Sequence, residues 1–175
     1  SAVSLSNLIS NAGVVATDTT GVGTARVDPS ACEYGADLGI FGYGNPGYLS
    51  MTNLVSNVGV IGTDVTGVGT GRYTLAACTY DYDKGIFGFG YTGSDTAITN
   101  LVSNTGVVAT DTAGVGTARH ELAATQYAGD KGIFGYGTTG TEVSLTNLVS
   151  NAGVVATDTT GVGTARQTSS ACSFN

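Results

Sequence analysis

Charged side chains are scarce in this sequence, and positively charged ones are the scarcest. Its 175 residues include six Lys and Arg against 13 Asp and Glu, so the net charge is −7. Charged residues make up 11% of the chain, whereas soluble domains typically have about 25%. Six scattered cations cannot neutralise a phosphate backbone, so we expect no nucleic-acid binding. No run approaches the ~18 apolar residues that span a bilayer, so we expect no membrane insertion.

Residues that carry metal or redox chemistry are equally few. The chain has three cysteines, one histidine and no tryptophan. An odd number of cysteines does not indicate a disulfide framework, and no CxxC-type spacing predicts a metal site. Cys32, Cys78 and Cys172 recur at one position of an internal repeat, where the third copy has Thr125. We therefore expect a small, half-buried residue that threonine can replace.

What the sequence has in abundance is glycine and self-similarity. Twenty-eight residues are glycine, about twice the usual ~7%. One segment, which reads NLVSNAGVVATDTTGVGTAR in its fourth copy, begins at Asn7, Asn53, Asn100 and Asn147. A second segment, GIFGYG or GIFGFG, follows three of these copies. A period of this length indicates units that bury their core by stacking on one another.

Each unit contains four runs rich in Val, Ile, Thr, Phe and Tyr and bounded by turn residues, which is typical of β-strands. In the last complete unit these runs are 117–127, 131–137, 142–150 and 153–159. No window has apolar residues at helical spacing together with capping residues, so we expect almost no helix. Four short antiparallel strands in each unit indicate a propeller blade.

We therefore predict an all-β fold, a β-propeller-like array of four four-stranded antiparallel units of about 47 residues each. The units are approximately 1–26 with 167–175, 27–72, 73–119 and 120–166. The glycines of the GIFGYG strands suit a close approach of neighbouring blades. Phe41, Phe87 and Phe134 share one position of that strand, and we expect them to pack between blades. A β-solenoid and a long meander sandwich are the alternatives.

The predicted array is one strand short of closure. The first expected strand, 2–10, and the last, 166–174, would share a blade that lacks its GIFGYG strand. An unpaired edge of this kind favours pairing with another chain. Three interpretations follow: a piece of a longer propeller, a strand donated by a neighbouring chain in an oligomer or filament, or a blade that tolerates three strands.

Two stretches carry a resemblance to known propeller repeats. The run RHELAATQY from Arg119, followed by KGIFGYG from Lys131, resembles a kelch repeat. The same stretch led by GVVATDT is similar to the repeat of the RCC1 family. The sequence departs from both patterns, because it lacks the kelch tryptophan and the RCC1 glycine-histidine feature. Both resemblances imply a β-propeller.

A second resemblance concerns the whole repeat. TNLVSNTGVVATDTAGVGTAR together with DKGIFGYG resembles repeat-bearing hypothetical structural proteins of marine tailed phages. That resemblance implies a component of a virion or of another extracellular surface.

One acidic and one basic residue recur in every unit, and we expect each Asp to pair with the Arg of its own unit. The pairs are Asp18 with Arg26, Asp64 with Arg72, Asp111 with Arg119, and Asp158 with Arg166. They predict either a turn network that fixes the loop or four equivalent binding pockets for a carboxylate, sulfate or sugar. One Asp per loop is too few for calcium. The GVGT string lacks the Lys-Ser/Thr ending of a phosphate loop, so we expect no metal and no cofactor.

Catalytic residues have no repeated arrangement. His120 stands where other units have Val27, Tyr73 and Gln167, which is a poor place for a general base. We expect no enzyme and no catalytic residues. The sequence favours a structural or adhesive surface protein, extracellular or virion-associated, whose partners are copies of itself or neighbouring structural proteins. A multivalent carbohydrate-binding propeller that binds glycans and a protein-interaction scaffold of kelch type are the alternatives.

Overall fold

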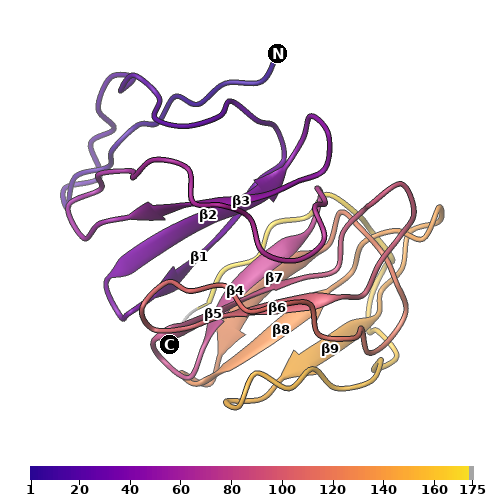
Figure 1. Cartoon of the computed structure of the whole chain (residues 1–175). Helices are drawn as coiled ribbons and strands as arrows, with labels where there is room; N and C mark the ends of the chain where they lie inside the picture. Colours follow the sequence, from indigo (N-terminus) through magenta and orange to yellow (C-terminus); the bar gives the residue numbers. More distant parts are fainter. Residues whose placement is uncertain (174–175) are drawn as a thin grey trace.

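The computed structural model describes residues 1–173, and every regular element in that range is a β-strand (Figure 1). Nine strands form three antiparallel sheets, each in chain order. The first sheet contains β1 (Ser30–Tyr34), β2 (Leu38–Gly44) and β3 (Leu49–Val55). The second contains β4 (Ala76–Tyr80), β5 (Lys84–Gly88) and β6 (Thr99–Val102). The third contains β7 (Ala123–Tyr127), β8 (Lys131–Gly135) and β9 (Thr146–Val149).

The all-β prediction is therefore confirmed, and residues 1–173 include no helix that could cross a membrane. In every sheet the GIFGYG segment is the middle strand, so both of its edges are paired. The register is the same each time: Ala31 lies opposite Phe41, Ala77 opposite Phe87, and Ala124 opposite Phe134.

The fourth strand expected in each unit is not formed. In the last unit the run 153–159 makes only two isolated bridges, Val149 with Val155 and Thr146 with Thr159. Between these bridges the side-chain amide of Asn147 donates to the carbonyl of Ala156 at 3.0 Å. A side chain thus satisfies a backbone acceptor that a strand partner would otherwise satisfy. Each unit is a three-stranded sheet with an irregular outer segment.

The sheets stack in chain order. Strand β1 packs beside β4, and β4 packs beside β7. Figure 1 shows the three sheets following one another across the molecule, with the indigo N-terminal segment on the outer side of the first sheet. A Cβ atom added to Gly42 would lie 2.8 Å from Cζ of Phe87, and one added to Gly88 would lie 2.7 Å from Cζ of Phe134. Only glycine leaves room for these rings.

The core lies between successive sheets. Phe87 and Phe134 are fully buried, which confirms that their position packs between units. Phe87 makes an edge contact with Tyr43, with ring centroids 5.1 Å apart, and Phe134 makes one with Phe89 at 5.2 Å. Such pairs contribute about 0.5–1.5 kcal/mol beyond area burial. Phe41 has no preceding unit of this kind to pack against within residues 1–173 and is 37% exposed.

A closed ring of four units is not confirmed, because the described residues form three sheets and none of them closes. The expected strand 2–10 has only three isolated bridges, at Val3, Ser6 and Ile9. The expected strand 166–174 has no strand in its described part, and Phe174 lies outside the described residues. Four repeat-equivalent side chains nevertheless line one pocket of about 350 Å³: Cys32, Cys78, Thr125 and Cys172.

Candidate functional site at the repeat junctions

The Asp and Arg residues predicted from the sequence do come together, but across units rather than within them. Nη1 of Arg119 lies 3.9 Å from Oδ1 of Asp158, which belongs to the following unit. The charge of Arg72 likewise acts on Asp111, and that of Arg26 on Asp64. The expected pairing within one unit is therefore wrong. Each Asp meets the Arg of the preceding unit, because each GVGT loop reaches over the next unit.

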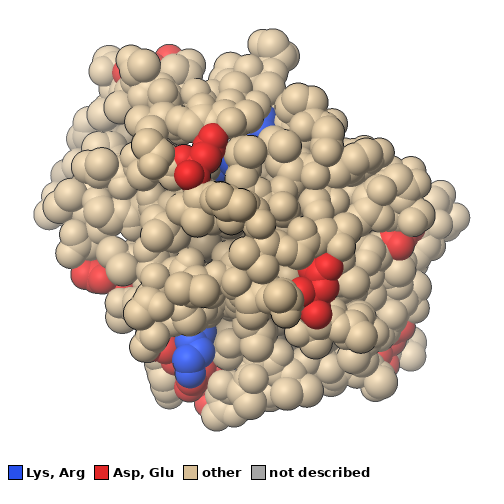
Figure 2. All heavy atoms as spheres, in the orientation of Figure 1, with Lys and Arg blue, Asp and Glu red and all other residues tan. Residues whose placement is uncertain are grey.

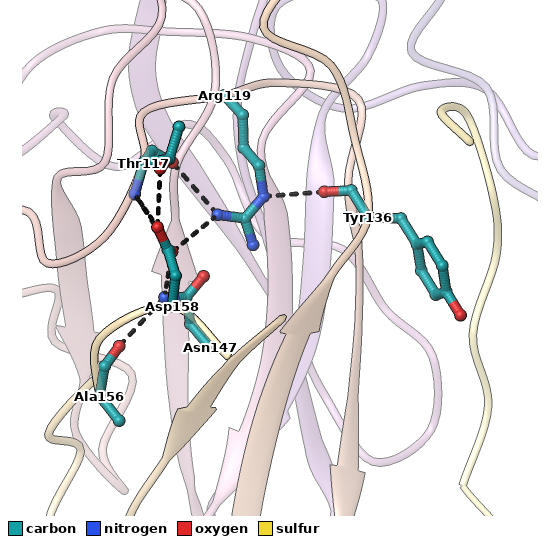
Figure 3. A network of polar contacts seen from close by, with 6 residues as sticks. All are labelled: Thr117, Arg119, Tyr136, Asn147, Ala156 and Asp158. Carbon is teal, nitrogen blue, oxygen red and sulfur yellow. Dashed lines mark hydrogen bonds and ion pairs between the residues drawn. The ribbon is translucent and has the colours of Figure 1, made fainter. Parts of the chain in front are cut away.

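Threonine makes the main contact of each junction (Figure 3). The backbone N–H of Thr117 donates to both carboxylate oxygens of Asp158, at 3.2 and 3.0 Å, and its hydroxyl donates to Oδ2 at 2.7 Å. Asn147 donates to Oδ1 from the other side at 2.9 Å. The same contacts join Thr70 to Asp111 and Thr24 to Asp64. We call this set of contacts the Thr–Asp junction.

A glycine makes room for each junction. Gly116 precedes Thr117 with a φ of 89°, and a Cβ atom there would lie 2.4 Å from Oδ1 of Asp158. Because of the positive φ and the close approach of the carboxylate, a residue with a side chain cannot replace glycine at this position. This requirement explains the second glycine of the GVGT loop.

The arginine lies beneath the carboxylate and connects two sheets. Arg72 stacks on the ring of Tyr43 in the first sheet, 4.2 Å from the centroid. Its Nε donates to the carbonyl of Phe89 and its Nη2 to Oδ1 of Asn100, both at 2.8 Å and both in the next unit. Arg119 likewise stacks on the ring of Phe89 and donates from Nε to the carbonyl of Tyr136, but its Nη2 has no partner among the described residues. Both arginines are completely buried, so their charges depend on these partners.

Burial and hydrogen bonding shift the pKa values of the junction groups in ways that follow from this geometry. Burial lowers the pKa of Arg119 to about 10, although Asp158 opposes the change. Burial also disfavours ionisation of Asp158, but hydrogen bonds from Thr117 and Asn147 outweigh it and the pKa lies below its ordinary value. The hydrogen bond from Asn53, followed by that from Thr24, lowers the pKa of Asp64. The carboxylates are therefore held in their charged form.

The two ends of the array each carry half of a junction. Asp18 accepts a hydrogen bond from Asn7 at 2.9 Å, and within residues 1–173 no threonine donates to it. Thr164 and Arg166 are exposed at the other end. A Cβ atom added to Gly163 would meet nothing within 4 Å, in contrast to Gly116. Arg166 does stack on Tyr136, at 3.7 Å.

Other polar groups are scattered. His120 contacts Asp95 at 2.6 Å, and Lys131 contacts Asp130 at the same distance. No cluster of three or more metal-ligating side chains occurs in the described part of the chain. Cys78 is buried, and burial raises the pKa of its thiol to about 12. Figure 2 shows a face that is mostly uncharged, with separate small acidic areas and little basic surface.

The sequence did not indicate the junction residues Thr24, Thr70 and Thr117, nor the role of the Asn that starts each repeat. Asn147 bonds the outer segment of its own unit and also holds the carboxylate of Asp158. The available signal was that Thr, Asn and Asp recur unchanged in all four copies. A scan of the chain against protein-family models and a search of curated proteins both found no match.

Proposed function

We propose that this chain is a non-enzymatic structural or adhesive protein whose repeats form a rigid propeller-like module that assembles with other chains. The observation that carries the proposal is the Thr–Asp junction. The most regular polar residues of the sequence serve to join one unit to the next, and both oxygens of Asp64, Asp111 and Asp158 are occupied by that contact. This occupancy argues against glycan pockets at these positions.

The two ends of the array are chemically complementary. One end presents the acceptor Asp18, held by Asn7, and the other presents the donors Thr164 and Arg166. Contact between the tail of one copy and the head of another would repeat the internal junction. A head-to-tail contact of this kind builds rings where the rotation closes and filaments where it does not.

The finer architecture that we propose is a propeller of kelch or RCC1 type. The pocket shared by Cys32, Cys78, Thr125 and Cys172 supports it, because equivalent residues meet at one place when inner strands surround an axis. For location we propose a virion or another extracellular surface. The resemblance of the repeat to structural proteins of tailed phages supports this location.

Negative-stain electron microscopy of the purified chain over a concentration series tests the assembly proposal. We expect rings, filaments or larger particles, and we expect Asp18→Ala to reduce them without unfolding the chain, since Asp18 takes part in no internal Thr–Asp junction. Asp37→Ala is the matched control, because Asp37 is also exposed and also accepts a hydrogen bond from an asparagine, Asn57, but lies in the turn between β1 and β2. Monodisperse single chains at every concentration would contradict the proposal.

A further inference from the structure

A pocket of about 210 Å³ lies on the outer side of the third sheet. One wall is the face of that sheet, with Ala124, Ile133, Gly135 and Tyr136. The opposite wall is the following segment, with Arg166 and Ala171. The same surface of the first and second sheets is covered by the next unit, so the internal copies show what this pocket is shaped to hold.

In both internal copies a phenylalanine of the next middle strand fills the position. Phe87 of β5 packs on Gly42, and Phe134 of β8 packs on Gly88, so closely that a Cβ atom on either glycine would clash with the ring. Each ring also meets the aromatic residue after that glycine, Tyr43 or Phe89, edge to face. A glycine followed by an aromatic residue thus forms a seat for one phenylalanine ring.

The third sheet presents the same seat without a ring in it. A Cβ atom added to Gly135 would touch only Cγ2 of Thr146, at 3.5 Å. Tyr136 follows this glycine, as Tyr43 and Phe89 follow theirs, and within residues 1–173 it makes no aromatic pair. Its ring is already covered on one side by Arg166, as Phe89 is by Arg119.

The segment beside the pocket can pair with a strand. Its residues Ser170, Ala171 and Cys172 match Ser30, Ala31 and Cys32 of β1 in sequence. In β1, Ala31 pairs with Phe41 and Cys32 with Ile40. In β7, Ala124 pairs with Phe134 and Thr125 with Ile133. An incoming strand in this register would place phenylalanine opposite Ala171 and isoleucine opposite Cys172.

We propose that this pocket and its flanking segment bind an extended chain segment of the pattern Gly-Ile-Phe-Gly-aromatic-Gly by β-strand addition. The phenylalanine occupies the seat at Gly135 and Tyr136, and the main chain pairs with 170–172. Arg166 donates to the carbonyl of the aromatic residue two positions after the phenylalanine, as Nε of Arg119 does to Tyr136 at 2.8 Å. The inference deepens the assembly proposal by naming the chemistry of one partner segment, but it does not require two copies to associate.

A synthetic peptide with the sequence of residues 130–139, DKGIFGYGTT, is the probe. We expect saturable one-to-one binding to the 175-residue chain, measured by fluorescence polarisation at a concentration where sedimentation shows single chains. A peptide carrying Phe134→Ala should bind at least about tenfold more weakly, because it loses the ring that fills the seat.

The chain variant Gly135→Ala places a methyl group where the ring must sit, while the protein's own atoms tolerate it. We expect it to weaken peptide binding by about tenfold or more without changing the circular dichroism spectrum. Gly62→Ala is the matched control, since its added Cβ would meet only the carbonyl of Leu54 at 3.5 Å, far along the chain from the pocket. It should bind the peptide as the unaltered chain does.

Absence of saturable binding, or binding that ignores both Phe134→Ala in the peptide and Gly135→Ala in the chain, would overturn the proposal. Self-association that needs no peptide and is abolished by Gly135→Ala would assign the pocket to a second copy instead, and would also overturn it. Chains that stay single and bind the peptide would support this proposal while removing that of self-assembly, so the two failures are distinguishable.

Discussion

Thr117 and Asp158 are 41 residues apart in the sequence, yet Thr117 donates both its backbone N–H and its hydroxyl to the Asp158 carboxylate. The separation is close to one repeat, and the same contact occurs at Thr70 and Asp111 with the same spacing. Each unit is thus tied to the next by charge-assisted hydrogen bonds, which are about twice as strong as neutral ones. Beneath them a buried arginine joins the two sheets.

Replacing Asp111 by alanine should destabilise the protein, because the change leaves the Thr70 donors and one donor of the buried Asn100 without their acceptor. We expect the free energy of unfolding to fall by about 2 kcal/mol. Asp18→Ala is the matched control. Asp18 accepts only from Asn7 among the described residues, so its loss should cost less than about 0.5 kcal/mol. Urea denaturation measures both, and equal losses would contradict the structural role of the junction.

Glycines at one repeat position should differ sharply in their tolerance of alanine. A Cβ atom on Gly88 would come within 2.7–3.2 Å of three ring atoms of the buried Phe134, so Gly88→Ala should lower the free energy of unfolding by about 1–3 kcal/mol through overpacking. The methyl group of Gly135→Ala would make only an ordinary contact with Cγ2 of Thr146, at 3.5 Å, so this change should be nearly neutral. Thermal denaturation followed by circular dichroism compares the two. A similar loss in both variants would mean that the sheets do not stack in this way.

Replacing arginine by lysine should lower the free energy of unfolding substantially only where the arginine is buried. Arg72 uses Nε, Nη1 and Nη2 for three separate acceptors while stacking on Tyr43, and an ammonium group cannot reproduce that planar set of donors. Arg72→Lys should therefore cost about 2–4 kcal/mol of unfolding free energy. The exposed Arg166 has no such carbonyl or amide partner among the described residues, and Arg166→Lys should cost less than about 1 kcal/mol. Chemical denaturation of the two variants provides the comparison.

Stability should decline in acid because the junction carboxylates lose their charge. Burial disfavours ionisation of Asp111, but hydrogen bonds from Thr70 and Asn100 together with the charge of Arg72 outweigh it, and its pKa lies below 3.8. A carboxyl whose folded pKa is depressed stabilises the protein above its unfolded pKa and loses this contribution as the pH falls through the folded value. We expect constant stability from pH 7 to about 5 and a decrease below about 4. Asp111→Ala should decrease less steeply, and a parallel decrease would contradict this assignment.

The hairpins and the inter-unit packing could be predicted from the sequence because their signals are local or unambiguous. Short runs that contain Thr, Ile, Phe or Tyr between turn residues identify β7 and β8. A glycine beside a phenylalanine implies close sheets, as seen for Gly88 and Phe134. The run 153–159 looked like a strand for the same reason. The run makes only isolated backbone bonds to β9, and between them the side chain of Asn147 bonds the carbonyl of Ala156. Strand propensity does not indicate such a side-chain contact.

The pairing of Asp with Arg was wrong because near-identical repeats do not specify which copy supplies the partner. Asp111 and Arg119 are neighbours along the chain, and nothing in their spacing distinguishes a contact within one unit from a contact with the next. Only the direction in which the GVGT loop leaves its sheet decides that Asp111 meets Arg72 and that Arg119 meets Asp158. Closure of the array is undetermined by sequence for the same reason.

Cross-linking between two variants that each carry one added cysteine tests whether the ends of the array complete one another's junctions. In a Cys172→Ser background, which removes the exposed native thiol, one chain carries Thr164→Cys and the other Asp18→Cys. We expect a disulfide-linked dimer on mild oxidation of the mixture and little of it from either variant alone, because position 164 of one copy then lies against position 18 of another. Equal yields of dimer from the mixture and from the separate variants, or no dimer in any sample, would contradict it.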